Sequence, residues 1–226
     1  MKVLYEDNHL IIVSKDAGEI VQGDKTGDTP LSEVVGLYLK EKYGKPGNAF
    51  VGVVHRLDRP VSGAVLFAKT SKALPRLNAM LAGHGKVRKT YWAIVCRRPT
   101  QDSGTLTHWL TRNAKNNSAR AYDREVPMSK KAVLDYRLLA GSDRYWLLEV
   151  ELHTGRHHQI RCQLAKIGCP IKGDLKYGAP RSNPDGSISL HARRIELEHP
   201  VSHTRIDVCA PVPDDRLWKE ITMGVT

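Results

Sequence analysis

The sequence predicts an α+β fold, with a mixed and mostly antiparallel central sheet that is flanked by helices and loops. Short apolar segments with the pattern of strands outnumber helical segments along the chain, and they lack the regular strand-helix-strand alternation of parallel α/β proteins. The 226 residues are enough to bury a substantial hydrophobic core. Because we find no repeat, low-complexity segment or linker, we interpret residues 1–226 as a single domain.

The first elements are predicted to be a strand pair and a helix. Residues 3–5 and 10–13 have the pattern of short strands, and "EDN" between them supplies turn residues, which predicts a hairpin. The stretch "GDTPLSEVVGLYLKEKYG" predicts a helix with Thr29 as N-cap, Pro30 at the first helical position and Gly44 as the stop. Its apolar residues recur at helical spacing, at Leu31, Val34, Val35 and Leu39.

Two buried strands and a second helix are expected next. Residues 49–57 and 62–70 crowd apolar and β-branched side chains on both sides of the turn "DRPVSG", so Asp58 is predicted to lie at a strand end. Ser71 can cap the following helix, and "GHG" at residues 83–85 is expected to end it. Residues 89–95, "KTYWAIV", then alternate well enough for another strand.

The second half of the chain continues with strands and short helices. A polar loop is expected over residues 112–131, between a strand edge and a further strand. "RYWLLEVEL" predicts a strand, and "GRHHQIRCQLAKIG" a helix with Ile160, Leu164 and Ile167 directed inward. "SISLHARRIELEHP" predicts another strand, and "PDDRLWKEI" a last helix capped by Asp214.

The charge balance indicates a polyanionic partner. Thirty-five Lys and Arg residues against twenty-four Asp and Glu give a formal charge of +11 and a pI near 9.6, which favours nucleic acid through the release of condensed counterions. A basic surface that only aids solubility is the alternative. The expected loop over residues 112–131 has the composition of an arm that contacts RNA, or of an ordinary solvated loop. Its cations are Arg112, Lys115, Arg120, Arg124, Lys130 and Lys131.

Cysteine usage and hydropathy favour a cytoplasmic protein. Cys96, Cys162, Cys169 and Cys209 follow no CxxC spacing and lie in segments predicted to be buried, as reduced core thiols do. The N-terminal segment has no signal-peptide pattern, and no apolar run approaches the length of a membrane span.

Three other kinds of site fit the sequence poorly. A zinc site at His153, His157 and His158 would need closely paired ligands, which Cys162 and Cys169 do not supply. A serine hydrolase is disfavoured because "RPVSGA" lacks the glycine before the serine that a nucleophile elbow uses. No phosphate-binding loop of the GxxxxGK[ST] type occurs. The residues thus disfavour a zinc site, a serine hydrolase and nucleotide-driven work.

Four ordered motifs resemble those of the RluA-type pseudouridine synthases. They are "HRLDRPVSGAVLFAK", "KTYWAIV", "TGRHHQIRCQLAKIGCPIKGDLKYG" and "LHARRIELEHP", which together extend from His55 to Pro200. The resemblance implies the pseudouridine synthase catalytic fold and an isomerase that converts a uridine in structured RNA, ribosomal or transfer, to pseudouridine. It implies base flipping, cleavage of the bond between C1′ and N1, and rejoining of the base through C5, without a metal, nucleotide or redox cofactor.

The family's pattern also implies roles for individual residues. Asp58 is the catalytic carboxylate, Tyr91 stacks on the target base and Arg161 pairs with Asp58. Arg56 resembles the arginine that fills the space left by the flipped nucleotide. Five further residues of the same motifs are expected to contact the substrate, namely His55, Arg59, Lys89, Arg156 and Leu190.

General chemistry agrees with these roles. A base stacked in RNA must be extruded before it can react, and a guanidinium plane such as that of Arg56 can replace its stacking. An aromatic ring at Tyr91 holds a base and still allows it to turn in its own plane. Arginines favour the anionic form of Asp58, which suits a nucleophile or a general base. The alternatives are a structural ion pair at Asp58 and an ordinary core tyrosine at Tyr91.

The remaining expectations concern the organisation of the protein. The catalytic motifs begin about fifty residues into the chain, so we expect no separate N-terminal RNA-binding domain of the kind that many family members carry. Target choice would then depend on the catalytic domain. We expect a monomer. A non-catalytic RNA-binding or ribosome-assembly protein with the same basic cleft is the competing class of function.

Overall fold

The chain folds into two compact units. The structure is a computed structural model, and it describes residues 1–83 and 86–225. Unit 1 comprises Met1–Lys89 and Ala192–Pro211, and unit 2 comprises Thr90–His191 and Val212–Thr226. The chain therefore passes between the units within strand β5 (Val87–Val95), within strand β10 (Leu190–Glu198) and after Pro211.

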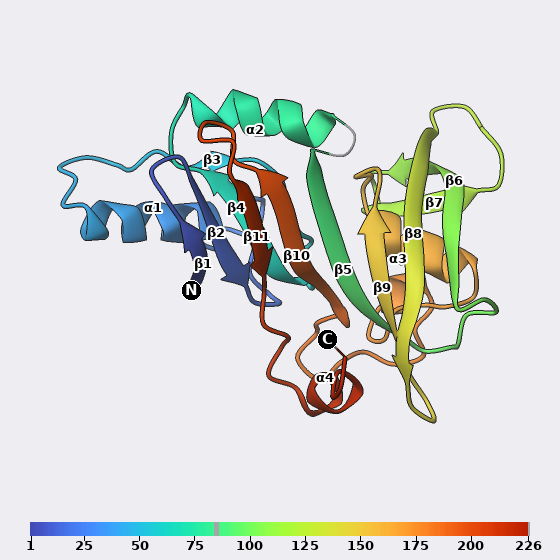
Figure 1. Cartoon of the computed structure of the whole chain (residues 1–226). Helices are drawn as coiled ribbons and strands as arrows, with labels where there is room; N and C mark the ends of the chain where they lie inside the picture. The colour runs from blue at the N-terminus through green and yellow to red at the C-terminus, as the bar shows by residue number, and fades with distance from the viewer. Residues whose placement is uncertain (84–85, 226) are drawn as a thin grey trace. The chain divides into compact units, whose positions relative to one another are not determined.

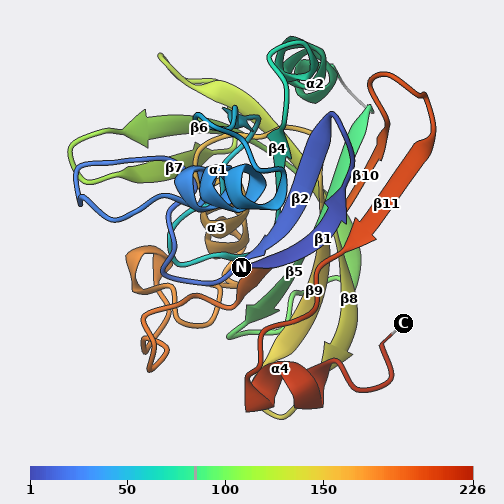
Figure 2. The ribbon, with the colours of Figure 1, turned by 90° about the vertical axis from the view of Figure 1, so that its left-hand side faces the viewer.

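Unit 1 is built on the strand order β1-β2-β4-β10 (Figures 1 and 2). The predicted N-terminal hairpin is β1 (Lys2–Glu6) with β2 (Leu10–Lys15), and β2 pairs antiparallel with β4 (Ser62–Ala68). The short β3 (Gly52–Val53) also pairs with β4, and β11 (Arg205–Cys209) pairs with β10. The pairings of β1 with β2, β2 with β4, β3 with β4 and β10 with β11 are all antiparallel.

Two helices belong to unit 1, α1 (Leu31–Lys42) and α2 (Ala73–Ala82). The side chains that α1 buries are Leu31, Val35 and Leu39, at the helical spacing seen in the sequence. Helix α2 contributes Ala73 and Leu77 to a core with alternate residues of β2, β4, β10 and β11. This packing fixes α2 against one face of the strands.

Unit 2 is an antiparallel sheet with the order β5-β9-β8-β6-β7. Its strands are β6 (Ser103–Asn113), β7 (Ser118–Tyr122), β8 (Lys130–Gly141) and β9 (Trp146–Leu152), together with the Thr90–Val95 part of β5. Helix α3 (Gln159–Lys166) packs Cys162 against Leu110, Ala119 and Ala132. A 3-10 turn, η1 (Leu175–Tyr177), and α4 (Arg216–Ile221) complete the unit.

The predicted α+β class with mostly antiparallel strands is confirmed, whereas three predicted helix caps are wrong. Helix α1 has Pro30 rather than Thr29 as N-cap, and α4 is capped by Asp215 rather than Asp214, with the Asp215 carboxylate accepting from the Trp218 N–H at 3.1 Å. At α2 the hydroxyl of Thr70, not Ser71, accepts from the Ala73 N–H at 3.1 Å. Gly83 is the C-cap of α2, and the other two residues of "GHG" lie outside the described residues.

Two predicted boundaries and one predicted loop also need correction. The strand expected over residues 49–57 is only Gly52–Val53, so Asp58 lies in a turn five residues beyond it rather than at its end. Helix α3 begins at Gln159, after the "GRHH" that was assigned to it. Strand β7 occupies part of the expected loop over residues 112–131, because its backbone pairs with β6 despite its polar composition. Within residues 1–83 and 86–225, no helix has the length and apolar character of a membrane span.

Candidate functional site

The predicted site residues are divided between the two units. Unit 1 contains His55, Arg56, Asp58, Arg59 and Lys89, and unit 2 contains Tyr91, Arg156, Arg161 and Leu190. Within each unit, one local arrangement fixes a key side chain: the turn that carries Asp58 in unit 1, and the start of α3 in unit 2. The expected pairing of Asp58 with Arg161 joins residues of different units and stays a prediction.

A tight turn carries Asp58 into strand β4. The carbonyl oxygen of Asp58 accepts from the Val61 N–H at 3.0 Å, with Arg59 and Pro60 at the centre of the turn. Directly after it, Gly63 has a φ of +118°, and a Cβ at this position would overlap the backbone of Ala192 in β10. Only glycine combines this conformation with so close an approach. The turn therefore leads into a strand whose place against β10 is closely defined.

Lys15, at the end of β2, contacts the backbone of the turn that carries Asp58. The side chain is fully buried, and its Nζ donates to the carbonyl oxygens of Val61 at 2.6 Å, Arg59 at 3.1 Å and Asp16 at 3.0 Å. Burial lowers the pKa of Lys15 to about 8, against the opposing influence of nearby carboxylates that include Asp58. A buried ammonium thus satisfies backbone acceptors on both sides of Pro60. No sequence motif marks Lys15 for this role.

Arg59 and Arg56 flank Asp58 but differ in their surroundings. The Arg59 guanidinium donates to Asp28 at 2.6 Å and to the Thr26 hydroxyl at 2.7 Å, and so ties the turn to residues 24–28. Arg56 is exposed to solvent. The structure therefore gives Arg59 a role in fixing the turn, while substrate contact by either arginine stays a prediction.

His55 is a hydrogen-bond acceptor within the fold of unit 1. Its Nε2 accepts from the Leu66 N–H at 3.0 Å, which places the ring proton on Nδ1. Burial, and secondarily the charge of Lys89, lowers the pKa of His55 to about 3. Burial also lowers the pKa of Lys89. His55 is consequently neutral near pH 7, and its ring positions the backbone of β4.

Tyr91 lies on strand β5 in the body of unit 2. It is 7% exposed and pairs in register with Val150 of β9. The neighbouring Trp92 packs with Trp218 of α4. Because successive side chains of a strand point to opposite faces, Tyr91 lies on the face of β5 away from α4.

Arg161 is held in a buried, bidentate ion pair. Its Nε donates to Oδ2 of Asp174 at 2.7 Å and a terminal nitrogen donates to Oδ1 at 2.9 Å. Arg161 is 6% exposed and Asp174 is 1% exposed. A charge pair at this depth needs good geometry to offset its desolvation, and the two parallel bonds provide it. They also fix the plane and the direction of the guanidinium.

His158 and Tyr177 support Arg161 on its other side. Arginine can only donate, so the contact of 3.1 Å between Arg161 and Nε2 of His158 makes Nε2 an acceptor. The Nδ1 proton of His158 then points to the Tyr177 hydroxyl at 2.8 Å, which also accepts from the Ala119 N–H at 2.8 Å. Burial raises the pKa of Tyr177 to about 12. His158, Asp174 and Tyr177 all lie in the motif "TGRHHQIRCQLAKIGCPIKGDLKYG". The sequence alone does not show that their side chains contact Arg161.

The last two expected contact residues have structural partners. Arg156 is exposed, and its Nε donates to the carbonyl oxygen of Lys131 at 3.0 Å. Leu190 is buried at the start of β10, and its N–H donates to the Ile188 carbonyl at 2.8 Å. Substrate contact by Arg156 and Leu190 stays a prediction.

The residues considered for zinc are engaged by protein groups in the described part of unit 2. His153 lies 2.6 Å from Asp135, and the ring nitrogens of His158 contact Arg161 and Tyr177. Cys162 donates to the Ala119 carbonyl at 3.4 Å. These contacts involve His153, His158 and Cys162, and the expectation that this segment binds no zinc stays a prediction.

The polar segment over residues 112–131 presents its cations to solvent. All six predicted basic residues are exposed, although β7 gives the segment an ordered backbone. The guanidinium of Arg120 lies 5.2 Å from the ring centre of Tyr122. A cavity of about 700 Å³ beside β7 is lined by these two residues together with Arg124 and Lys166. RNA contact by this segment stays a prediction.

Comparison with known proteins finds RNA pseudouridine synthases among the relatives of this chain. A family model described as RNA pseudouridylate synthase matches residues 9–166. An uncharacterized RNA pseudouridine synthase of Synechocystis sp. is 36% identical over 220 residues, which cover 94% of this chain and 66% of that protein. Ribosomal large subunit pseudouridine synthase D of Pseudomonas aeruginosa is 34% identical over 237 residues, covering 96% of this chain and 70% of that protein. The chain thus spans about two thirds of the length of these relatives.

Solved structures support the same fold. The human protein RNA Pseudouridylate Synthase Domain Containing 4 aligns with a TM-score of 0.80 and 22% identity, over 98% of this chain and 92% of that chain. At this identity the likeness shows the fold. The matched segment of the family model includes Asp58, Tyr91 and Arg161.

Proposed function

Because the chain belongs to the RNA pseudouridylate synthase family, whose members are isomerases that convert uridine in RNA to pseudouridine, we propose that Asp58 is its catalytic carboxylate. One observation carries this proposal: the buried Lys15 and the Val61 N–H fix the backbone of the turn in "HRLDRP" that presents Asp58. A carboxylate that must react at one atom of a flipped nucleotide reacts faster when its backbone is held in a fixed position.

Arg161 is proposed to orient Asp58. A guanidinium has five N–H bonds, and Asp174 and His158 use three of them in Arg161. These contacts fix the plane of the guanidinium, and a guanidinium held in a fixed plane suits bidentate pairing with a carboxylate. Pairing of Arg161 with Asp58 would hold the catalytic carboxylate as an anion. Asp174, His158 and Tyr177 would then be positioning residues.

Tyr91 and Arg56 are proposed to handle the target base. Tyr91 would stack on the uracil and allow its rotation in plane, which directional hydrogen bonds alone would resist. The exposed Arg56 would fill the space that the extruded nucleotide leaves in the RNA. His55, Arg59, Lys89, Arg156 and Leu190 would line the path of the substrate.

Two chemical routes use an anionic Asp58. In the first, the carboxylate attacks C1′, the bond to N1 breaks, and the uracil leaves as an anion. After rotation C5 attacks C1′ and displaces the carboxylate, and the C5 proton is lost as N1 gains one. In the second, Asp58 removes the proton of C2′ as the bond to N1 breaks, and C2′ regains a proton when C5 has joined C1′. The C5 proton is then lost as N1 gains one, as in the first route. Either route is an isomerisation with no net gain or loss of atoms.

We propose a structured RNA, ribosomal or transfer, as the substrate. The name of the Pseudomonas aeruginosa relative makes large-subunit ribosomal RNA the first to test. The net charge of +11 supports a polyanionic substrate of either kind.

The test is incubation of the purified protein with unfractionated RNA from a strain that lacks it, followed by mapping of carbodiimide-resistant uridine adducts. Wild-type protein is expected to create new adducts at one or a few sites, and Asp58→Asn at none, although it keeps the fold and the RNA affinity. Pseudouridine formed by a contaminant-free Asp58→Asn protein would remove Asp58 from the mechanism. RNA binding by the wild type without any new pseudouridine would favour the non-catalytic RNA-binding class.

Other expectations from the sequence stay predictions. They are a monomer in solution, a cytoplasmic location, a single functional domain over residues 1–226 and activity without a metal or nucleotide cofactor. Sedimentation analysis of the purified protein and an assay in the presence of a chelator would test the first and the last.

A further inference from the structure

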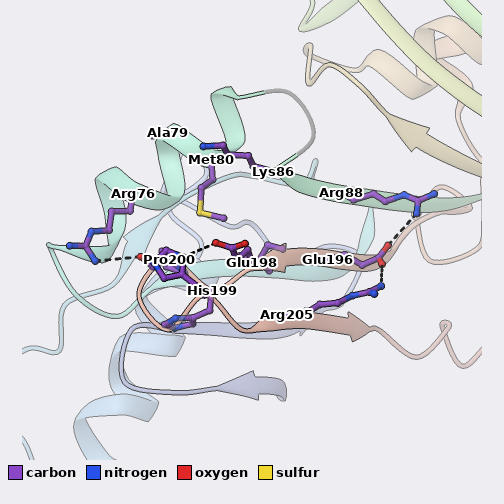
Figure 3. Close-up of a pocket in the computed structure, with 12 residues that line it drawn as sticks. Arg76, Ala79, Met80, Lys86, Arg88, Glu196, Glu198, His199, Pro200 and Arg205 are labelled. Atoms are coloured by element: carbon purple, nitrogen blue, oxygen red, sulfur yellow. Dashed lines mark hydrogen bonds and ion pairs between the residues drawn. The ribbon is translucent and has the colours of Figure 1, made fainter.

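A second polar groove lies in unit 1, between helix α2 and the hairpin of β10 and β11 (Figure 3). This hairpin groove encloses about 730 Å³. Arg76 and Met80 line it from α2, Lys86 and Arg88 from the segment that enters β5, and Arg205 from β11. None of its described lining residues belongs to the proposed uridine site.

A buried carboxylate organises the arginines of the groove. One oxygen of Glu196 accepts from Arg205 at 2.8 Å, and its carboxylate lies 3.8 Å from Arg88 and 3.7 Å from Arg194. The Glu196 side chain is only 12% exposed, whereas Arg88 is 56% and Arg205 73% exposed. The carboxylate of Glu196 is therefore mostly buried, whereas the guanidinium groups of Arg88 and Arg205 are exposed to solvent. Such pre-ordered arginines lose little freedom when they bind an anion.

Two more cations face the groove from the opposite wall. Arg76 donates to the carbonyl oxygen of Pro200 at 3.4 Å, a neutral acceptor that leaves the charge of Arg76 uncompensated in this contact. Lys86 is exposed at the entry to β5. On the hairpin, the carboxylate of Glu198 lies 2.6 Å from Nδ1 of His203, and Glu196 and Glu198 are the two carboxylates among the described lining residues, against the four cations Arg76, Lys86, Arg88 and Arg205. The outward charge of the groove is thus mainly positive.

The groove is not only charged, because apolar atoms lie between its cations. Met80 and Ala79 of α2 and Leu197 and Pro200 of the hairpin contribute to its lining. Phosphates suit the arginine and lysine groups, while sugar and base surfaces suit the apolar part. A polynucleotide combines these two kinds of surface at the spacing of one nucleotide.

We propose that the hairpin groove binds the phosphodiester backbone of the substrate RNA outside the target uridine. This inference rests on the proposed function, since it assigns the groove to the same RNA. Strand β10, which carries Glu196, pairs with β4, which directly follows the Asp58 turn. One sheet therefore sets the separation between groove and carboxylate, so that an RNA seated in the groove is positioned relative to Asp58.

The experiment compares three proteins on two RNAs. The groove variant is Arg76→Gln with Lys86→Gln, and the control variant is Lys2→Gln with Lys45→Gln, which removes the same charge from exposed sites elsewhere in unit 1. The RNAs are a stem-loop with uridines in its loop and the same stem-loop extended by duplex flanks. Affinity is measured over a series of salt concentrations, and thermal unfolding verifies that all three proteins fold.

The groove variant is expected to lose roughly tenfold in affinity for the extended RNA at low salt, with the log-log salt slope reduced by about 0.9 for each lost phosphate contact. Its affinity for the bare stem-loop, and both affinities of the control variant, should match the wild type. Equal behaviour of the groove and control variants on the extended RNA would overturn the proposal. So would competition by polyglutamate as effective as competition by duplex RNA, since that would indicate an acidic protein partner.

Pseudouridine formation by the wild type is scored in the same samples by carbodiimide. If the wild type forms none while the groove variant still shows its selective loss, the proposed function fails and the groove stands as an RNA-binding site. If the wild type is active and the variants bind alike, the function stands and the groove proposal fails.

Discussion

The Nζ of Lys15 lies 2.6 Å from the carbonyl oxygen of Val61, and both residues are buried. The same ammonium bonds the carbonyl of Arg59, so it bridges the two peptide groups around Pro60, immediately after Asp58. Arg59 also accepts from the Gly18 N–H at 2.8 Å, which adds a second anchor from the same segment. The position of Asp58 is therefore set by residues forty or more positions earlier in the chain.

Lys15→Met is expected to weaken both the fold and the reaction. Methionine fills most of the buried volume but cannot satisfy the Val61 carbonyl, which should cost about 1–3 kcal/mol in unfolding free energy. Because the turn loosens, kcat should fall more than KM changes. Urea unfolding and steady-state kinetics measure the two effects, with the exposed Lys45→Met as control. An unchanged kcat in a destabilised Lys15→Met protein would limit Lys15 to stability.

The titration of His55 should make unit 1 sensitive to acid. Its pKa of about 3 in the folded protein lies below the ordinary 6.5, so the unfolded chain takes up a proton first as the pH falls. The associated stability is present above pH 6.5 and is lost toward pH 3, by at most about 1.4 kcal/mol per pH unit. His55→Gln retains an acceptor for the Leu66 N–H and should flatten the dependence between pH 6.5 and 4.5. Parallel curves of unfolding free energy for the two proteins would contradict this origin.

Removal of the Asp174 charge should lower the unfolding free energy far more than removal of the charge of an exposed ion-pair partner such as Asp123. Asp174→Asn leaves the buried Arg161 without its counterion, and we expect a loss of about 3–5 kcal/mol in unfolding free energy. The matched control is Asp123→Asn, since Asp123 pairs with Lys166 of the same helix at 2.9 Å but is 76% exposed. That pair should contribute less than about 1 kcal/mol. Equal losses for the two variants, measured by chemical unfolding, would show that burial of the Arg161–Asp174 pair does not increase its contribution to the unfolding free energy.

Substitutions of Tyr91 separate stacking from hydroxyl chemistry. Tyr91→Phe keeps the ring and should retain part of the activity, whereas Tyr91→Ala loses the stacking surface and should lose roughly two orders of magnitude or more. Single-turnover rates at saturating RNA measure the difference. If Tyr91→Phe is as inactive as Tyr91→Ala, the hydroxyl rather than the ring is the essential group.

Arg56→Ala should fail at extrusion of the nucleotide. Its defect is expected to shrink on a short unstructured RNA, because the work of unstacking, a few kcal/mol in a structured one, is already done. Single-turnover kinetics on a stem-loop and on the unstructured RNA with the same flanking bases provide the comparison. A defect of the same size on both substrates would remove the flipping role from Arg56.

The spacing of apolar residues correctly predicted those helices and strands whose conformation agrees with their own local sequence. The apolar spacing of Leu31, Val35 and Leu39 corresponds to the buried face of α1, and the alternation in "KTYWAIV" lies within β5. The sequence does not predict strand β7, because "SARAY" has no β-branched residue and is followed by the charged Asp123 and Arg124. Its conformation depends on pairing with β6, such as Thr111 with Arg120, and pairing of this kind is not visible in one segment alone.

The candidate site was predicted only in part for a similar reason. Asp58, Tyr91 and Arg161 were selected through motifs, but their supports depend on contacts that the sequence does not specify. Lys15 meets carbonyl groups, which every residue possesses, so no pattern of residue types marks this contact. Asp174 lies thirteen residues after Arg161, beyond the reach of helical spacing, and the turn at Gly173 brings the two together.

The interleaving of the two units along the chain constrains the order in which the protein can mature during synthesis. Unit 1 needs β10 and β11 from residues 192–211, and unit 2 needs α4 from residues 216–221. When residues 1–89 have left the ribosome, the β1-β2-β4 strands can pair, yet the edge of β4 that later receives β10 is still open. Unit 1 cannot close before residue 209 has emerged, and unit 2 cannot close before residue 221 has emerged. Nascent chains that stall before residue 192 would therefore carry an open strand edge, the form most prone to association with other chains.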